Sequence, residues 1–183
     1  DTAEGKLERV QSVELDVEGS VTEVPDLVGV PRGKLILLND DDLTYASVRL
    51  DPESLATATA RIGDITDSMP RTLVWSAAWE MTRQAEMKAR DFVALVEHGI
   101  AAETEIGVVQ RVLLQATTAI ESYADQEWAT TIGWPGFSAR LLELARAAEA
   151  GSDHQLAFVN TLLAGRLFDE QIAVVRALLE GDD

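Results

Sequence analysis

The sequence predicts a mainly α-helical protein in which antiparallel α-hairpins stack as a short HEAT/armadillo-like superhelix, preceded by a small antiparallel β-sandwich portion. Three observations predict this fold. Apolar residues alternate with a period of two in residues 1–50, and they recur with a helical period from residue 51 onward. The links between the later apolar segments are short, which favours antiparallel helices. We therefore expect a partial β-sandwich domain at 1–50 and a superhelical domain at 51–183.

Short apolar runs predict four strands in the first part of the chain. Residues 13–17 (VELDV) and 21–24 flank a turn at Glu18-Gly19-Ser20, and residues 35–38 and 43–50 follow a connection that is rich in proline and glycine. A sheet of four short strands has unpaired edges. Because the first residue is Asp1 rather than Met, we expect a piece of a longer protein whose missing strands precede residue 1.

The helices are predicted from their caps and their periodicity. Asp51 is a good N-cap and Pro52 fits a first helical turn, so a helix is expected from there to about residue 62. Ser68 and Pro70 open the next helix. Five further helices are expected, over residues 91–98, 104–127, 138–150, 153–164 and 169–180. An apolar end face after the last helix would indicate that the superhelix continues beyond residue 183.

Composition limits the class of protein. The 183 residues include 15 basic and 32 acidic side chains, a formal charge of −17, which disfavours nucleic acid as a partner. No apolar run reaches the roughly 20 residues needed to cross a bilayer, and the N-terminus does not resemble a signal segment. The absence of cysteine excludes disulfides and thiolate zinc ligands. We expect a cytoplasmic protein that binds neither membrane nor nucleic acid.

No residue qualifies as a metal ligand by its spacing. His98 and His154 are 56 positions apart, so they do not form an H-E-x-x-H pair on one helical face, and we expect structural or surface roles for both. Asn39-Asp40-Asp41-Asp42 does not fit a calcium loop, because the sixth position from Asp40 is Tyr45 and not glycine. A hairpin turn that accepts positive φ explains this acidic run.

Other catalytic patterns are also missing. The sequence contains no G-x-S-x-G, no phosphate-binding loop and no dinucleotide fingerprint. Trp75 and Trp79 lie in an apolar helical face and are expected in the core, whereas Trp128 and Trp134 flank a glycine–proline loop where an interface role is open. The residues alone therefore predict no catalytic, cofactor-binding or metal-binding residue in this chain.

One segment carries a family resemblance. Residues 37–56, LLNDDDLTYASVRLDPESLA, resemble the junction between the β-sandwich and the C-terminal helical domain of bacterial zinc aminopeptidases of the aminopeptidase N family. Residues 13–17, GDITDS at 63–68, the R-x-L-x-W-x-x-x-W-x-M pattern from Arg71 to Met81, Leu163-Ala164-Gly165 and Phe168-Asp169 agree with this resemblance in order and spacing. The likeness covers residues 11–183.

The resemblance implies a structural role in an enzyme that removes N-terminal residues from peptides. That family holds zinc with H-E-x-x-H and a distant glutamate, and it recognises the free amine with G-x-M-E-N. Neither motif occurs here. We therefore expect a non-catalytic, zinc-free C-terminal fragment that is inactive alone. Its expected partner is the catalytic domain of the same polypeptide, over which the helical domain would close a chamber for peptide substrates.

Two alternatives remain open at this point. A free-standing α-helical repeat adaptor could bind a protein partner on its concave face. A small helical enzyme with an unrecognised carboxylate site would need a pair of strongly perturbed carboxylates in a closed pocket.

Overall fold

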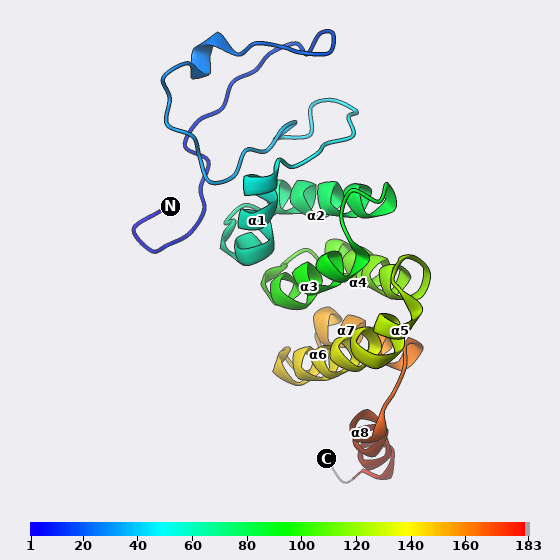
Figure 1. Cartoon of the computed structure of the whole chain (residues 1–183). Coiled ribbons are helices and arrows are strands. Elements are labelled where there is room, and N and C mark those ends of the chain that lie inside the picture. The colour runs from blue at the N-terminus through cyan, green and yellow to red at the C-terminus, as the bar shows by residue number, and fades with distance from the viewer. Residues whose placement is uncertain (182–183) are drawn as a thin grey trace.

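The computed structural model describes residues 1–181, and most of these beyond residue 51 are helical. Figure 1 shows the helices stacked in sequence order from α1 to α8, with the N-terminal segment looping over the α1–α2 end. The helices are α1 (Pro52–Arg61), α2 (Ser68–Arg83), α3 (Ala89–Gly99), α4 (Ile106–Thr118), α5 (Gln126–Trp128), α6 (Trp134–Ala147), α7 (Asp153–Ala164) and α8 (Asp169–Glu180). Two π-helical turns, η4 (Ala119–Tyr123) and η5 (Ala129–Gly133), flank α5.

The helices form two layers of an α-hairpin stack. Helices α1, α3 and α6 contact one another in sequence, and so do α2, α4 and α7 in the second layer. Antiparallel pairs such as α6 and α7 join the layers. Helix α8 contacts α6 and buries only Gln171, so little of its surface is covered by the stack. The helical part of the predicted fold is therefore confirmed.

The predicted β-sandwich portion is wrong. The described residues contain no strand, and one isolated parallel bridge joins Leu7 to Ile65. At the Gly19 turn, the side chain of Thr22 bonds both the N–H and the C=O of Glu18, so no backbone ladder begins there. Alternation makes a strand only where a neighbouring backbone pairs with it, and a two-stranded hairpin alone is marginal in water. Apolar side chains such as Val17, Val21 and Val28 are consequently exposed, each to more than 80%.

Ion pairs hold this extended segment against the helical stack. Lys6 pairs with Asp64 at 3.1 Å, and Arg32 pairs with the N-cap residue Asp51 at 2.6 Å. The acidic turn adopts positive φ at Asn39, Asp41 and Asp42, as predicted, but no strand flanks it within residues 1–181, so the predicted hairpin is wrong. The side chain of Asn39 closes the turn by bonding the N–H and C=O of Thr44.

Local signals explain where several helices begin. The Asp51 carboxylate accepts hydrogen bonds from the N–H groups of Glu53 and Ser54, and Pro52 occupies the first turn of α1. Ser152 caps α7 by accepting from the N–H of Gln155. These two predicted helix starts are confirmed.

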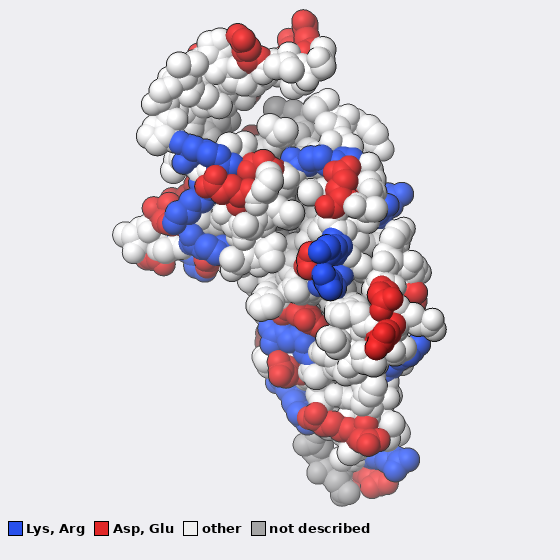
Figure 2. Space-filling view, viewed as in Figure 1, with Lys and Arg blue, Asp and Glu red and all other residues white. Residues whose placement is uncertain are grey.

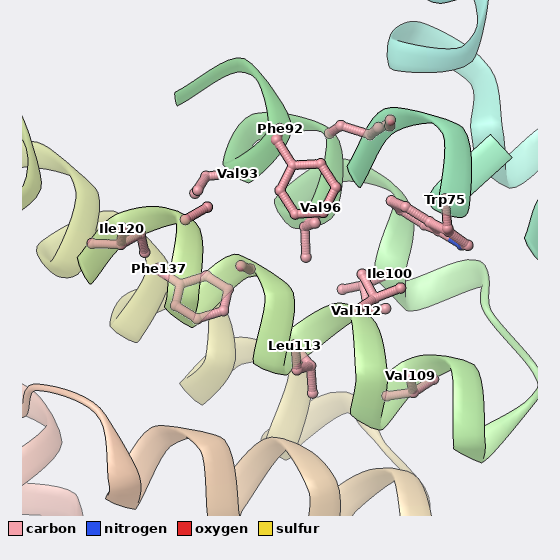
Figure 3. Packing of buried hydrophobic residues seen from close by; sticks show 14 of the residues in the cluster. Trp75, Phe92, Val93, Val96, Ile100, Val109, Val112, Leu113, Ile120 and Phe137 are labelled. Carbon is pink, nitrogen blue, oxygen red and sulfur yellow. The ribbon is translucent and has the colours of Figure 1, made fainter. Parts of the chain in front are cut away.

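The core runs through the middle of the stack between the two layers. Figure 3 shows it around Trp75 of α2, Phe92 and Val96 of α3, Leu113 of α4 and Phe137 of α6. Helix α4 contributes Val109, Val112, Leu113 and Ala116, which follow the i, i+3, i+4, i+7 spacing of a buried helical stripe. Gly99 allows α3 to approach its neighbours, because a Cβ there would lie 2.2 Å from Ile62 Cγ2.

Candidate functional site

A buried ion pair joins α2 to the segment that precedes α4. The side chains of Arg71 on α2 and Glu103, which precedes α4, are 5% and 0% exposed. Arg71 Nε donates to Glu103 Oε2 at 2.9 Å, and Arg71 Nη2 donates to Oε1 at 3.1 Å. The guanidinium and the carboxylate therefore form a bidentate ion pair.

Further hydrogen bonds satisfy both charged groups. Trp75 Nε1 and the backbone N–H groups of Thr104 and Glu105 donate to the Glu103 carboxylate. Arg71 Nη1 donates to the carbonyl of Ile65 at 2.7 Å. Desolvation raises the pKa of Glu103, but the hydrogen bonds from Arg71 and the backbone outweigh it and hold the pKa below its usual range. The cluster is closed to solvent and fully bonded, so we assign it a structural role.

An open groove lies where the α2–α3 turn faces the segment around α5. We call it the α3–α5 groove; it has a volume of about 340 Å³. Its lining is mostly apolar with a few charged groups and includes Met87, Lys88, Arg90, Tyr123, Asp125 and Trp128. Ligand-binding pockets have volumes of about 300–1,000 Å³, so this groove is at the lower end of the range and has room for one or two side chains of a partner.

Packing behind the α3–α5 groove fixes its aromatic walls. The ring of Tyr123 meets Trp79 edge-on at 5.8 Å, and Trp79 in turn contacts Phe92 at 5.3 Å. Trp128 lies against Gly133, where a Cβ would come within 2.7 Å of Trp128 Cζ3. Both walls are therefore held by neighbouring elements and need little ordering when a ligand binds.

A second groove separates α3 from α6 in the first layer. This α3–α6 groove has a volume of about 460 Å³ and is lined by Glu97, His98, Gly136, Ala139, Arg140 and Glu143. Arg140 donates to the backbone carbonyl of Glu97 and to the carboxylate of Glu143. Burial raises the pKa of Glu97, although His98 and Arg140 act in the opposite direction.

Comparison with known proteins places this architecture in a family. Residues 35–182 match the family described as ERAP1-like C-terminal domain. The chain belongs to this family. It is also 50% identical over 177 residues to an aminopeptidase N of Streptomyces lividans, an alignment that covers 97% of this chain and 20% of that relative. The resemblance to the aminopeptidase N family is thus confirmed, and the chain spans about a fifth of the relative's length.

The two histidines of this family member do not share a site. His98 Nδ1 lies 2.7 Å from the carbonyl of Ala94 in its own helix, and His154 Nε2 lies 3.1 Å from the carbonyl of Glu103. Within residues 1–181, no three His, Cys, Asp or Glu side chains are arranged to hold a metal ion. The expectation that the parent's zinc is held by other polypeptide stays a prediction.

The structure separates Trp128 from Trp134, for which the sequence left an interface role open. Trp75 is buried as expected, and Trp79 is half-buried in the aromatic cluster described above. Trp134, for which an interface role was open, is 2% exposed, packs on Phe137, and lies under the Arg166 guanidinium at 6.0 Å. Only Trp128 of the second pair reaches an open groove.

Sequence reasoning missed both grooves and the ion pair. Arg71 and Glu103 are separated by 32 positions, and no local pattern links them. Lys88, Arg90 and Tyr123 come together because the α2–α3 turn and η4 end at the same edge of the stack. The sequence does indicate that a helix begins at Asp125, because aspartate is a common N-cap residue and Gln126 and Glu127 follow it. None of the described helices is long and apolar enough to span a membrane.

Proposed function

We propose that this chain is a non-catalytic C-terminal part of a zinc-dependent aminopeptidase, and that its helical stack closes the chamber in which peptides lose their N-terminal residues. The observation that carries the proposal is the family match over residues 35–182, which covers the whole helical stack. The two-layered stack supports it, because a row of α-hairpins makes an extended wall. The proposed partner is the catalytic domain of the same polypeptide.

The distribution of polar groups also supports a non-catalytic role. The grooves contain no serine–histidine or similar nucleophile–base pair among the described residues. The buried carboxylate of Glu103 is occupied by Arg71 and is inaccessible. The bond-breaking chemistry would then belong to the parent's zinc and its ligands, which the family supplies through motifs that this sequence lacks.

A two-part experiment tests the proposal. The purified 183-residue chain is assayed with leucine p-nitroanilide and its zinc content is measured; we expect no hydrolysis and no stoichiometric zinc. The full-length enzyme is then compared with a version that lacks this segment, using the anilide and a 25-residue peptide. We expect the deletion to raise the relative rate on the long peptide. Circular dichroism and zinc content of the shortened enzyme verify that its catalytic part is folded.

Two outcomes would refute the proposal. Zinc-dependent hydrolysis by the isolated chain would show that it contains catalytic groups. An unchanged ratio of the two rates in a folded, zinc-loaded deletion variant would show that the helical stack does not restrict access.

The acidic excess suggests that this wall also attracts substrates. With a net charge of −17, a face turned toward the chamber would raise the local concentration of cationic peptide N-termini. We expect kcat/KM of the full-length enzyme to fall with added salt. Replacing Glu97 and Glu143 of the α3–α6 groove by Gln should flatten that dependence, whereas the same replacement of Glu14 and Glu23 should leave it unchanged. A flat salt profile in the unmodified enzyme contradicts the hypothesis.

The rival function is a free-standing helical adaptor. The α3–α5 groove favours a binding role of this kind, because it is open, partly apolar and rigidly walled. The two functions differ in the polypeptide that precedes residue 1. An H-E-x-x-H motif encoded upstream in the same reading frame supports the aminopeptidase, and its absence supports the adaptor.

A further inference from the structure

We propose that the α3–α5 groove is a docking site for an extended segment of a partner protein, in which an apolar side chain is followed by a residue that carries a carboxylate. The apolar side chain would enter the groove between Tyr123 and Trp128, and the carboxylate would meet Lys88 and Arg90. The proposal does not depend on the aminopeptidase role, because the groove belongs to the helical stack itself.

The lining residues are of the types that dominate protein recognition. Trp, Tyr, Met and Arg are enriched where interfaces bury most surface, whereas Lys and Glu are depleted there. The α3–α5 groove combines Met87 and Ala89, both buried at its base, with the exposed ring of Tyr123 and the half-buried ring of Trp128. An aliphatic or aromatic side chain of a partner would remove these apolar atoms from water.

The site is also preformed. Trp79 supports Tyr123 from behind, and Gly133 leaves room for the ring of Trp128. The π-helical turns η4 and η5 set the direction of the chain on both sides of this groove, and π-helical turns occur frequently at functional sites. A ligand that enters rigid walls loses less binding free energy to side-chain ordering.

The charges at the groove select the partner. Lys88 makes no ion pair within residues 1–181, and the nearest carboxylate to Arg90 is that of its neighbour Asp91 at 3.9 Å. Asp125, the acidic lining residue, already accepts a hydrogen bond from the N–H of Trp128 as the cap of α5. In Figure 2, Lys and Arg side chains form several separate patches on the face shown, one of them in its middle with an acidic side chain beside it. Lys88, together with Arg90 and its long 3.9 Å pair to Asp91, therefore favours an anionic group beside the apolar side chain.

The net charge of the chain limits how acidic that partner can be. At −17, the molecule repels a strongly acidic protein at long range. One or two carboxylates next to the apolar side chain gain from Lys88 and Arg90 without a large long-range penalty. A basic segment would be attracted to the rest of the surface, but Lys88 and Arg90 would repel it from this groove.

Peptide titration with NMR detection tests the proposal. The ¹⁵N-labelled 183-residue chain is titrated with N-acetylated, C-amidated Gly-Ser-Leu-Glu-Gly, and with versions in which Gln replaces Glu or Gly replaces Leu. We expect shifts in the indole N–H of Trp128 and in the amides of residues 87–90 and 123–125. The Gln peptide should bind roughly fivefold more weakly, which is the size of an exposed charge contribution. The Gly peptide should give no saturable shift.

Matched variants locate the charge effect. Replacing Lys88 and Arg90 by Gln should remove the preference for Glu over Gln. Replacing Arg111 and Arg146 by Gln, which changes the net charge equally at other exposed positions, should preserve it. Equal affinity for the Glu and Gln peptides, shifts that lie elsewhere, or no binding at millimolar peptide would overturn the proposal. Shifts at the groove that depend on protein concentration without peptide would instead identify a second copy of the chain as the occupant, and would also overturn it.

Discussion

Replacing Glu103 by Gln should destabilise the helical stack more than any single exposed charge replacement. The carboxylate of Glu103 accepts two hydrogen bonds from Arg71 and one each from Trp75 and the N–H groups of Thr104 and Glu105. A Gln amide offers one oxygen in place of two, and its NH₂ group would face a donor. The buried guanidinium would also lose its counter-charge. Removal of one partner from a buried pair costs about 3–5 kcal/mol.

Urea unfolding monitored by tryptophan fluorescence and circular dichroism measures this loss. At an m-value of about 3 kcal/mol/M, the expected cost lowers the midpoint by roughly 1–2 M. Glu80→Gln is the matched control, because Glu80 pairs with Arg83 at 2.8 Å on the exposed side of α2. Exposed pairs contribute about 0–1 kcal/mol, so the control midpoint should scarcely move. Similar shifts for the two variants, at equal m-values, would refute the structural role of the buried pair.

The pH dependence gives an independent check on Glu103. Its pKa in the folded chain is lowered, so its contribution to stability is present above the unfolded value of about 4.3 and is lost as the pH falls through the lowered folded value. The difference in unfolding free energy between the unmodified chain and Glu103→Gln should therefore be constant near neutral pH and shrink in acid. A difference that stays unchanged in acid would show that the charge of Glu103 is not responsible.

Three further predictions concern single substitutions at a close contact, a strained turn and a helix cap. Gly99→Ala should destabilise the chain by about 1–3 kcal/mol in urea unfolding, because its Cβ would lie 2.2 Å from Ile62 Cγ2. Gly107→Ala, whose Cβ would have no atom within 4 Å, should be neutral or stabilising. Equal effects of the two substitutions would contradict the packing argument. Ala85→Gly should raise stability by about 0.5–1 kcal/mol, because Ala85 has a φ of 61°; a lower urea midpoint would contradict this. Asp51→Ala should reduce helicity by circular dichroism and lower the Tm by a few degrees, because the cap of α1 is lost. The hydrogen bonds from Ser54 lower the pKa of Asp51, so its contribution to stability is lost below that pKa and the difference between the two chains should vanish in acid. An unchanged Tm at neutral pH would refute the capping role.

Helix starts with local caps could be predicted from the sequence, and helix ends that depend on neighbours could not. The Asp51-Pro52 and Ser152-Asp153 starts are correct because the capping side chain and the helix are adjacent in sequence. The segment 104–127 was predicted as one helix, but α4 ends at Thr118 and a π-helical turn follows. Periodicity alone cannot detect that Asp125 caps a new helix and does not continue the old one.

The loop predicted around Trp134 shows a second limit. The glycines and the proline of this segment predicted a loop between helices. In the structure, Pro135 lies in the first turn of α6, where its missing N–H costs nothing, and Gly136 continues the helix. The β-sandwich prediction failed for a related reason. An alternating pattern predicts which side chains lie on the same face of a strand, but it does not predict which backbone segment pairs with that strand. In the described structure, no backbone segment pairs with residues 1–50 to form a strand.

The Arg71–Glu103 pair and the α3–α5 groove are formed by different residues. The buried groups that hold α2 against the segment before α4 lie near the start of α2, where Trp75 and Thr104 complete the hydrogen bonds. The α3–α5 groove forms at the other end of α2, where the turn through Ala85 is exposed. Substitutions that alter Lys88 or Arg90 should therefore change binding without weakening the buried contact between α2 and the segment before α4. If peptide binding instead shifted the unfolding midpoint of Glu103→Gln and of the unmodified chain by different amounts, this separation of the two regions would be disproved.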